Sequence, residues 1–158
     1  MGRKRLLFLL LTLFTVAAAA EAEKQLTYAE DLAAAGETAR AQGKPVVVFF
    51  FQEQCHYCET VRHQFLLPIN GNEDYQDRII LRQINTRART PIRDFKGEKV
   101  ASAQFARRED KRFTPTIAFY GPDGKQLAKP LIGLKGGRDY YGHYLDKGIE
   151  KAEAAIGK

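Results

Sequence analysis

The two cysteines of the chain lie three positions apart, in the run Cys55-His56-Tyr57-Cys58. Thiols at this spacing can form a disulfide and exchange it with a partner, because a thiolate attacks a disulfide through a mixed-disulfide intermediate. Two alternatives stay open. A purely structural disulfide would more usually close a longer loop. A copper- or zinc-binding module would need a histidine such as His56, His63 or His143 beside the two sulfurs. The chain has no second Cys-x-x-Cys or His-x-x-His pair, so the spacing favours redox exchange.

The sequence around the cysteines predicts a strand that feeds a helix. Residues 46–51 are six apolar residues, half of them β-branched, which is typical of a strand buried on both faces. After the pair, Cys58, Val61 and Phe65 share one helical face, and Pro68 is expected to stop the run. Cys55 would then lie at the helix N-terminus, where free N–H groups and the helix dipole favour a thiolate.

The first residues have the three parts of a secretory signal peptide. Basic residues 1–5 precede the apolar run 6–20, and small residues suit cleavage near Ala20 or Ala22. An uncleaved anchor is the alternative, but a run of fifteen residues, interrupted by Thr12 and Thr15, falls short of the roughly 20 that span a bilayer. We therefore expect a signal peptide at 1–22, a single domain at 23–158, periplasmic localisation and no stable membrane insertion after cleavage. The formal charge of +6 falls to +3 when the three basic leader residues are removed, which gives no reason to expect nucleic acid binding.

The rest of the chain alternates helices and strands. We expect a helix from a capping box at 27–30 to Gln42, a second strand over 79–84 and a helix over 101–108. A third strand begins at Pro115, and a Gly-Pro-Asp-Gly turn at 121–124 returns the chain into segment 126–132. Pro130 confines that segment to a sheet edge. A last helix spans 137–156, and 86–99 is expected to be loop with an edge strand near 99–100.

This order of elements resembles the thioredoxin fold, an α/β fold. The resemblance covers nearly all of residues 23–158 and depends on two separated motifs, Cys55-His56-Tyr57-Cys58 and Thr114-Pro115-Thr116. It implies a central mixed sheet of about four to five strands with helices on both faces. In this superfamily a cis-proline lies beside the active disulfide, so the resemblance implies a cis Thr114–Pro115 bond next to Cys55 and a Thr114 backbone that binds substrate. The chain is most similar to the exported thioredoxin-like group that includes SoxW-type proteins.

The dipeptide between the cysteines departs from cytoplasmic thioredoxin, which has Gly-Pro there and a buried acid six residues earlier. Here the dipeptide is His56-Tyr57, and the earlier position is Phe49. Glu53 is a candidate substitute for the acid, and a solvated surface acid is the alternative. A partly protonated His56 at a helix N-terminus would stabilise the Cys55 thiolate and make the disulfide more oxidising. We therefore assign redox tuning to His56 and Tyr57.

A basic region lies between Arg82 and Arg112, with ten Lys or Arg residues against four acids. Its last part, 107–112, precedes Thr114 and should lie near the disulfide. It would be either a solvated face or a positive rim that steers acidic partner segments.

Together these patterns predict an exported thiol–disulfide oxidoreductase. Cys55 is the expected nucleophile, Cys58 the resolving thiol, and Thr114 and Pro115 the substrate-binding residues. No metal or organic cofactor is required. The expected partners are secreted or periplasmic cysteine-containing proteins and a membrane electron donor or acceptor.

Overall fold

The central strand of the molecule is β1 (Val46–Phe51), in which every residue is buried. The computed structural model describes residues 25–156, so the predicted signal peptide lies outside the described residues. On one side β1 pairs in parallel with β2 (Ile80–Asn85), and on the other side it pairs antiparallel with β5 (Thr116–Tyr120). β6 (Gln126–Ile132) joins β5 antiparallel and completes a mixed sheet in the order β2-β1-β5-β6. The predicted central strand and the edge position of 126–132 are confirmed.

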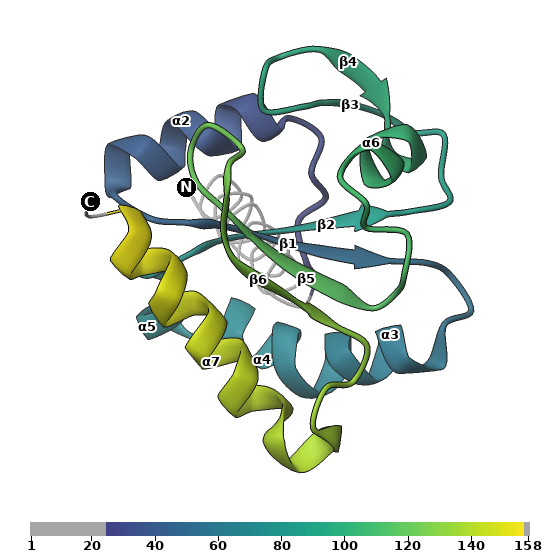
Figure 1. Cartoon of the computed structure of the whole chain (residues 1–158), viewed down its shortest axis with the longest axis vertical. Coiled ribbons are helices and arrows are strands. Elements are labelled where there is room, and N and C mark those ends of the chain that lie inside the picture. The colour runs from purple at the N-terminus through teal and green to yellow at the C-terminus, as the bar shows by residue number, and fades with distance from the viewer. Residues whose placement is uncertain (1–24, 157–158) are drawn as a thin grey trace, which may run out of the picture.

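Helices cover both faces of this sheet (Figure 1). One face carries α2 (Leu32–Gln42) and α6 (Ser102–Arg108). The other face carries a helical run made of α3 (His56–Val61), the π-helical turn η1 (Arg62–Leu66) and α4 (Leu67–Asn70), followed by α5 (Glu73–Gln76). The long C-terminal helix α7 (Gly137–Ile156) packs on this second face. This is the thioredoxin fold, as the sequence predicted.

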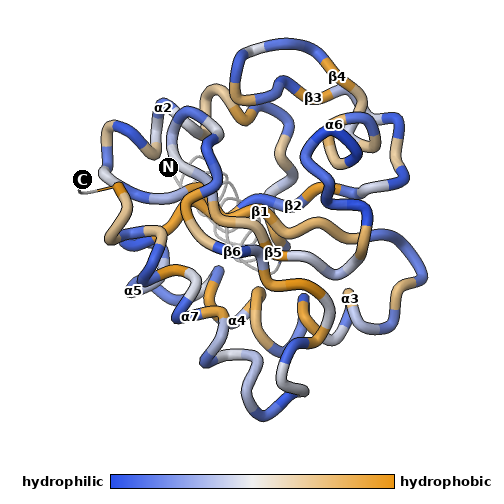
Figure 2. Tube along the Cα trace, in the orientation of Figure 1, coloured by the Kyte–Doolittle hydropathy of each residue, from blue (hydrophilic) through white to orange (hydrophobic). Residues whose placement is uncertain are grey.

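Two apolar cores result from the alternation of side chains along β1. Val47, Phe49 and Phe51 belong to the core under α7 and the Cys58 helix, whereas Val46, Val48 and Phe50 belong to the core under α2 and α6. The central strand β1 is accordingly apolar along its length in Figure 2, whereas β2 and β6 also include polar residues.

The start of α2 differs from the sequence prediction. The N-cap is Asp31, whose carboxylate accepts a hydrogen bond from the Ala34 N–H at 2.8 Å, and not a residue of the predicted capping box. Tyr28 lies instead in a parallel bridge to Gln83 of β2. Pairing with the sheet edge keeps 27–30 extended, which the local capping pattern did not reveal.

The predicted stop at Pro68 is also wrong, because the helical run continues to Asn70. Pro68 lies in the first turn of α4, where the preceding π-helical turn has interrupted the α-helical hydrogen-bond pattern. A proline in a first helical turn loses no helical hydrogen bond, so the chain continues through it.

The segment predicted as loop with an edge strand near 99–100 contains an antiparallel hairpin of β3 (Pro91–Arg93) and β4 (Lys99–Ala101). β4 is the predicted strand, and β3 was not predicted. Asp94 opens its turn and is 1% exposed. Its carboxylate accepts hydrogen bonds from the backbone of Lys96 and Glu98 and from Arg108 of α6. Across residues 25–156, we find no helix with the length and hydropathy needed to cross a membrane.

Candidate active site

The candidate site is the turn between β1 and α3, where Cys55 is the N-cap residue of the helix. Its extended backbone places the sulfur at the first turn, and Cys55 Sγ accepts a hydrogen bond from the Cys58 N–H at 3.2 Å. A disulfide joins the two cysteines, whose Cα atoms are 5.1 Å apart. Cys55 is half-buried, whereas Cys58 is 0% exposed. After reduction, Cys55 is therefore the sulfur that a partner can reach.

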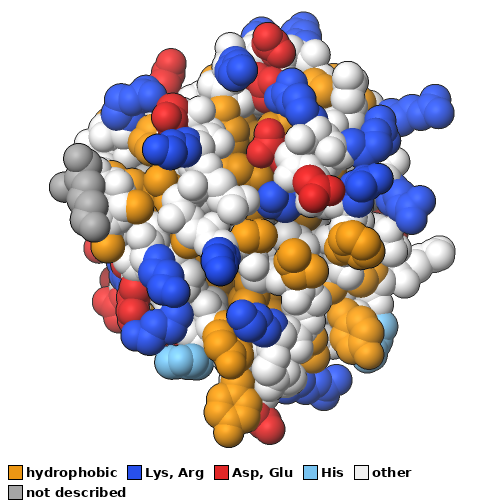
Figure 3. Space-filling view, in the orientation of Figure 1, with side chains coloured by type: hydrophobic (Ala, Val, Ile, Leu, Met, Phe, Trp, Pro, Cys, Tyr) orange, Lys and Arg blue, Asp and Glu red, His pale blue; other side chains and the backbone are white. Residues whose placement is uncertain are grey.

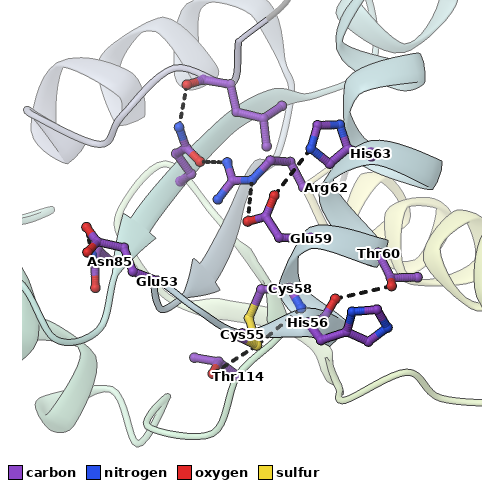
Figure 4. Close-up of polar contacts among 12 residues, drawn as sticks. Glu53, Cys55, His56, Cys58, Glu59, Thr60, Arg62, His63, Asn85 and Thr114 are labelled. Atoms are coloured by element: carbon purple, nitrogen blue, oxygen red, sulfur yellow. Dashed lines mark hydrogen bonds and ion pairs between the residues drawn. A yellow bond between two sulfur atoms is a disulfide. The ribbon is translucent and has the colours of Figure 1, made fainter.

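The loop before β5 brings Thr114 to the disulfide (Figure 4). The Thr114 hydroxyl donates to Cys55 Sγ at 3.8 Å, although the two residues are 59 positions apart. The peptide bond from Thr114 to Pro115 is cis. The Pro115 carbonyl accepts from the Gly133 N–H at 2.8 Å, which fixes the loop to the end of β6. The two motifs found in the sequence thus meet at one site.

His56 and Tyr57 lie on the solvent side of the turn. The imidazole of His56 extends away from the sulfurs in Figure 4, and its ring centroid lies 5.9 Å from that of Tyr57. Tyr57 is 59% exposed, and Phe113, just before Thr114, is 73% exposed. Sequence patterns had not singled out Phe113. Its position next to the Thr114-Pro115 motif was the available signal.

Glu53 does not take the place of a buried acid. It is exposed, and its carboxylate accepts a hydrogen bond from the Asn85 side chain at 3.2 Å. In Figure 4 it points toward Asn85 and away from the disulfide. The core position considered for an acid holds Phe49, which is completely buried. Of the two alternatives for Glu53, a substitute for the buried acid or a solvated surface acid, the structure supports the second.

A partly buried arginine on the active-site helix is the main feature that the sequence did not reveal. The Arg62 guanidinium lies 4.4 Å from the ring centroid of Phe51 and 5.3 Å from that of Phe49. It donates to the side-chain carbonyl of Gln83, and its Nε lies 3.5 Å from the Glu59 carboxylate. The spacing of four residues from Cys58 was the available signal, because residues at that spacing share a helix face.

The basic region divides into two groups. Arg108 forms ion pairs with Asp94 and Glu98, and Lys111 is buried with its ammonium on the Glu109 carbonyl. These two cations therefore stabilise the fold around α6. Others, including Arg107, are exposed. Figure 3 shows Lys and Arg side chains over α6, beside exposed apolar side chains toward the α3 end of the sheet.

The histidines considered as metal ligands do not converge on the cysteines. His63 pairs with Glu59 at 3.2 Å, and His143 packs beside Tyr144 on α7. Within the described part of the chain, no three His, Cys, Asp or Glu residues are grouped so that they could hold a metal ion. The described geometry thus gives no support to the metal-binding alternative.

Comparison with known families identifies the fold and the kind of site. The model of a thioredoxin-like domain matches residues 32–146, which include both cysteines and the Thr114-Pro115 motif. This chain belongs to the thioredoxin-like domain family. Its Cys-x-x-Cys disulfide and its family membership together indicate a thiol–disulfide oxidoreductase.

Solved structures similar to this thioredoxin-like domain include mitochondrial thioredoxin 3 from Saccharomyces cerevisiae, at 19% identity and a TM-score of 0.50, covering 79% of this chain and 93% of that one. The thioredoxin of Malassezia sympodialis matches at 15% identity and a TM-score of 0.51, with coverages of 82% and 92%. The oxidoreductase DsbH matches at 16% identity and a TM-score of 0.52, covering 80% of this chain and 86% of that one. At these identities the similarity shows the fold alone. The chain has no significant match among curated proteins.

Proposed function

We propose that this protein is an exported thiol–disulfide oxidoreductase that exchanges disulfides with cysteine-containing partner proteins. One observation carries the proposal: Cys55 caps the helix N-terminus at the surface, while Cys58 is completely buried behind it. Free N–H groups at the helix start favour the Cys55 thiolate, and the thiolate is the attacking species. Cys58 can reach only the sulfur of Cys55.

The exchange proceeds in two balanced steps. The Cys55 thiolate attacks a partner disulfide, so one S–S bond forms, the partner's S–S bond breaks, and a partner thiolate leaves. Cys58 then loses its proton and attacks Cys55 Sγ, which releases the second partner thiolate and forms the Cys55–Cys58 disulfide. The partner gains two electrons and this protein loses two. The reverse sequence oxidises a partner dithiol.

Substrate binding is assigned to Thr114 and Pro115. Among residues 25–156, no backbone group pairs with the N–H or the C=O of Thr114, and its hydroxyl lies on Cys55. An extended partner segment can therefore hydrogen-bond to this backbone beside the reacting sulfur. The exposed aromatic rings of Tyr57 and Phe113 add apolar contact area near that segment.

Oxidation of partners is the direction that His56 favours. A protonated imidazole at the helix start stabilises the reduced, thiolate form, which makes the disulfide a stronger oxidant. The exposed position of His56 makes this contribution modest, since solvent screens it. The ring of Tyr57 lies edge-on to the imidazole, with the ring centroids 5.9 Å apart.

Export to the periplasm is the proposed setting, because an oxidising compartment lets the pair act as a disulfide. The support is the basic, apolar and small-residue pattern of residues 1–22. The proposed partners are secreted or periplasmic cysteine proteins and a membrane electron donor or acceptor, as in the SoxW-type group that the sequence resembles.

Trapping of mixed disulfides tests the proposed roles. Cys58→Ser removes the resolving thiol, so this variant should accumulate partners linked to Cys55, visible on non-reducing gels and released by dithiothreitol. Cys55→Ser is the matched control and should trap none. Equal trapping by both variants, or trapping by neither, would contradict the assignment.

A further inference from the structure

Arg62 places a partly buried positive charge between the active-site helix and the sheet. Its side chain is only 15% exposed, and a guanidinium stays protonated at all physiological pH values. Two phenyl rings of β1 lie against it, at 4.4 Å for Phe51 and 5.3 Å for Phe49. The only carboxylate paired with it among the described residues belongs to Glu59, which is half-exposed and shared with His63. Solvent therefore screens the counter-charge more than it screens the guanidinium.

Arg62 lies one helical turn after Cys58, the buried cysteine of the pair. The Arg62 N–H bonds to the Cys58 carbonyl, so the two residues lie one turn apart on a continuous helix. Residues at this spacing share a face, and long helical side chains point back toward the N-terminus, over the preceding turn. The ion pair of Arg62 with Glu59, three positions earlier, agrees with that direction. Figure 4 shows the guanidinium between Glu59 and the sheet, on the helix that carries the disulfide.

Contacts from the sheet hold the guanidinium in place. Gln83 of β2 accepts its hydrogen bond and donates its own side-chain N–H to the Leu26 carbonyl at 2.6 Å. The Gln83 backbone is tied on both sides to the N-terminal segment, through Thr27 and Ala29. A charge fixed in this way costs no reorganisation when the charge on the cysteines changes.

We propose that Arg62 sets the redox equilibrium of the Cys55–Cys58 pair by stabilising its reduced, thiolate form. The disulfide is neutral, and the reduced pair carries a thiolate, so a fixed positive charge favours reduction of this protein and strengthens it as an oxidant. The inference rests on the proposed function and names a residue that regulates the same site. Arg62 touches no substrate and acts through the two cysteines.

The test measures the equilibrium of each variant with reduced and oxidised glutathione at one pH. Neutral variants Arg62→Gln and Arg62→Met should lower the equilibrium constant for reduction of the protein about tenfold, equivalent to about 30 mV. Arg62→Lys keeps the charge and should restore the constant to within about threefold of wild type. A merely structural role would not follow charge in this way.

Arg78→Met is the matched control for lost packing. Arg78 also stacks on an aromatic ring, Tyr75 at 5.6 Å, and also pairs with a carboxylate, Glu153 at 2.7 Å. Its removal should leave the glutathione equilibrium unchanged. The proposal is overturned if the neutral Arg62 variants shift the constant no more than Arg78→Met does, or if Arg62→Lys shifts it as far as Arg62→Met.

Glu59→Gln gives a readout that does not require a core substitution. It removes the partial counter-charge at an exposed position, so the equilibrium constant for reduction should rise, opposite to the Arg62 variants. An unchanged or lowered constant contradicts the proposal. These equilibria use glutathione alone, so failure of Cys58→Ser to trap partners would overturn the proposed function while leaving the role of Arg62 measurable.

Discussion

Tyr141→Phe should stabilise this protein, although most core substitutions do the reverse. Tyr141 is completely buried, and its hydroxyl has no hydrogen-bond partner among the described residues. Its ring packs against Phe65, with centroids 4.7 Å apart, under the helix that carries Cys58. Burial raises the pKa of the Tyr141 phenol well above its usual value, so the group stays neutral. Phenylalanine keeps the ring and removes only the unpaired hydroxyl.

The expected gain follows from two opposing terms. Burying a hydroxyl without a hydrogen bond costs about 1–3 kcal/mol in mutational data. The space left by one oxygen atom, on the order of 10–15 Å³, costs about 0.3 kcal/mol at the cavity coefficient. The free energy of unfolding should therefore rise by about 1–2 kcal/mol, measured by urea denaturation of the oxidised protein.

Tyr120→Phe provides the same chemical change with the opposite expected sign. Tyr120 is equally buried, but its hydroxyl donates to the Glu109 carboxylate at 3.3 Å. Loss of that bond should lower the free energy of unfolding by about 0.5–1.5 kcal/mol. If Tyr141→Phe destabilises the protein as Tyr120→Phe does, the Tyr141 hydroxyl has a partner and the reasoning fails.

Three further predictions concern the hairpin, α7 and the redox pair. Burial alone would raise the pKa of the Asp94 carboxyl, but hydrogen bonds from Arg108 and from two backbone N–H groups outweigh it and lower that pKa. The stabilisation by Asp94 is therefore full above the unfolded value near 3.9 and is lost as pH falls through the folded pKa. In Asp94→Asn, the free energy of unfolding should therefore fall less steeply than in the wild type as the pH is lowered. An unchanged pH dependence would refute this. Gly148→Ala would drive a methyl group into the Phe119 ring and should cost about 1–3 kcal/mol. Gly142→Ala, on the same helix, would place its methyl group in ordinary van der Waals contact with Phe65 and should gain up to about 1 kcal/mol. Equal effects of the two substitutions on thermal melts would contradict the packing. The wild-type reduction potential should lie at roughly −230 to −150 mV, and His56→Pro should lower it in glutathione titrations. A wild-type value at or below about −270 mV would show that this dipeptide does not make an oxidant.

Local patterns predicted most of the fold because the central strand is strongly apolar and proline and glycine residues mark the turns between elements. The strand at 46–51 and the helix at 137–156 follow directly from apolar period and length. The start of α2 and strand β3 were not predicted, whereas β4 lies where an edge strand was expected. Tyr28 is held extended by its bridge to Gln83, and β3 combines local pairing with β4 with contacts from Arg93 to Glu30 and Asp31, far earlier in the chain.

The site was predictable where chemistry follows from spacing in the sequence, as in the Cys55–Cys58 pair. The position of Thr114 against Cys55 came from family resemblance, since no local rule joins residues 59 positions apart. Arg62 was not predicted, because charged side chains mostly face solvent and its spacing from Cys58 alone does not show burial. The guanidinium is held by the side chain of Gln83, which lies on strand β2 and not on the helix that carries Arg62.

The two outer strands of the sheet restrict how another polypeptide can attach. Backbone groups of Gln83, in the middle of β2, already bond to Thr27 and Ala29 of the N-terminal segment. At the opposite margin, Pro130 of β6 has no N–H to offer, and Lys129 beside it is exposed and charged. Both outer edges of the sheet are thus protected against pairing with another strand, whereas the backbone of Thr114 has no such pairing within the part of the chain that the structure describes and stays open for the extended segment proposed above.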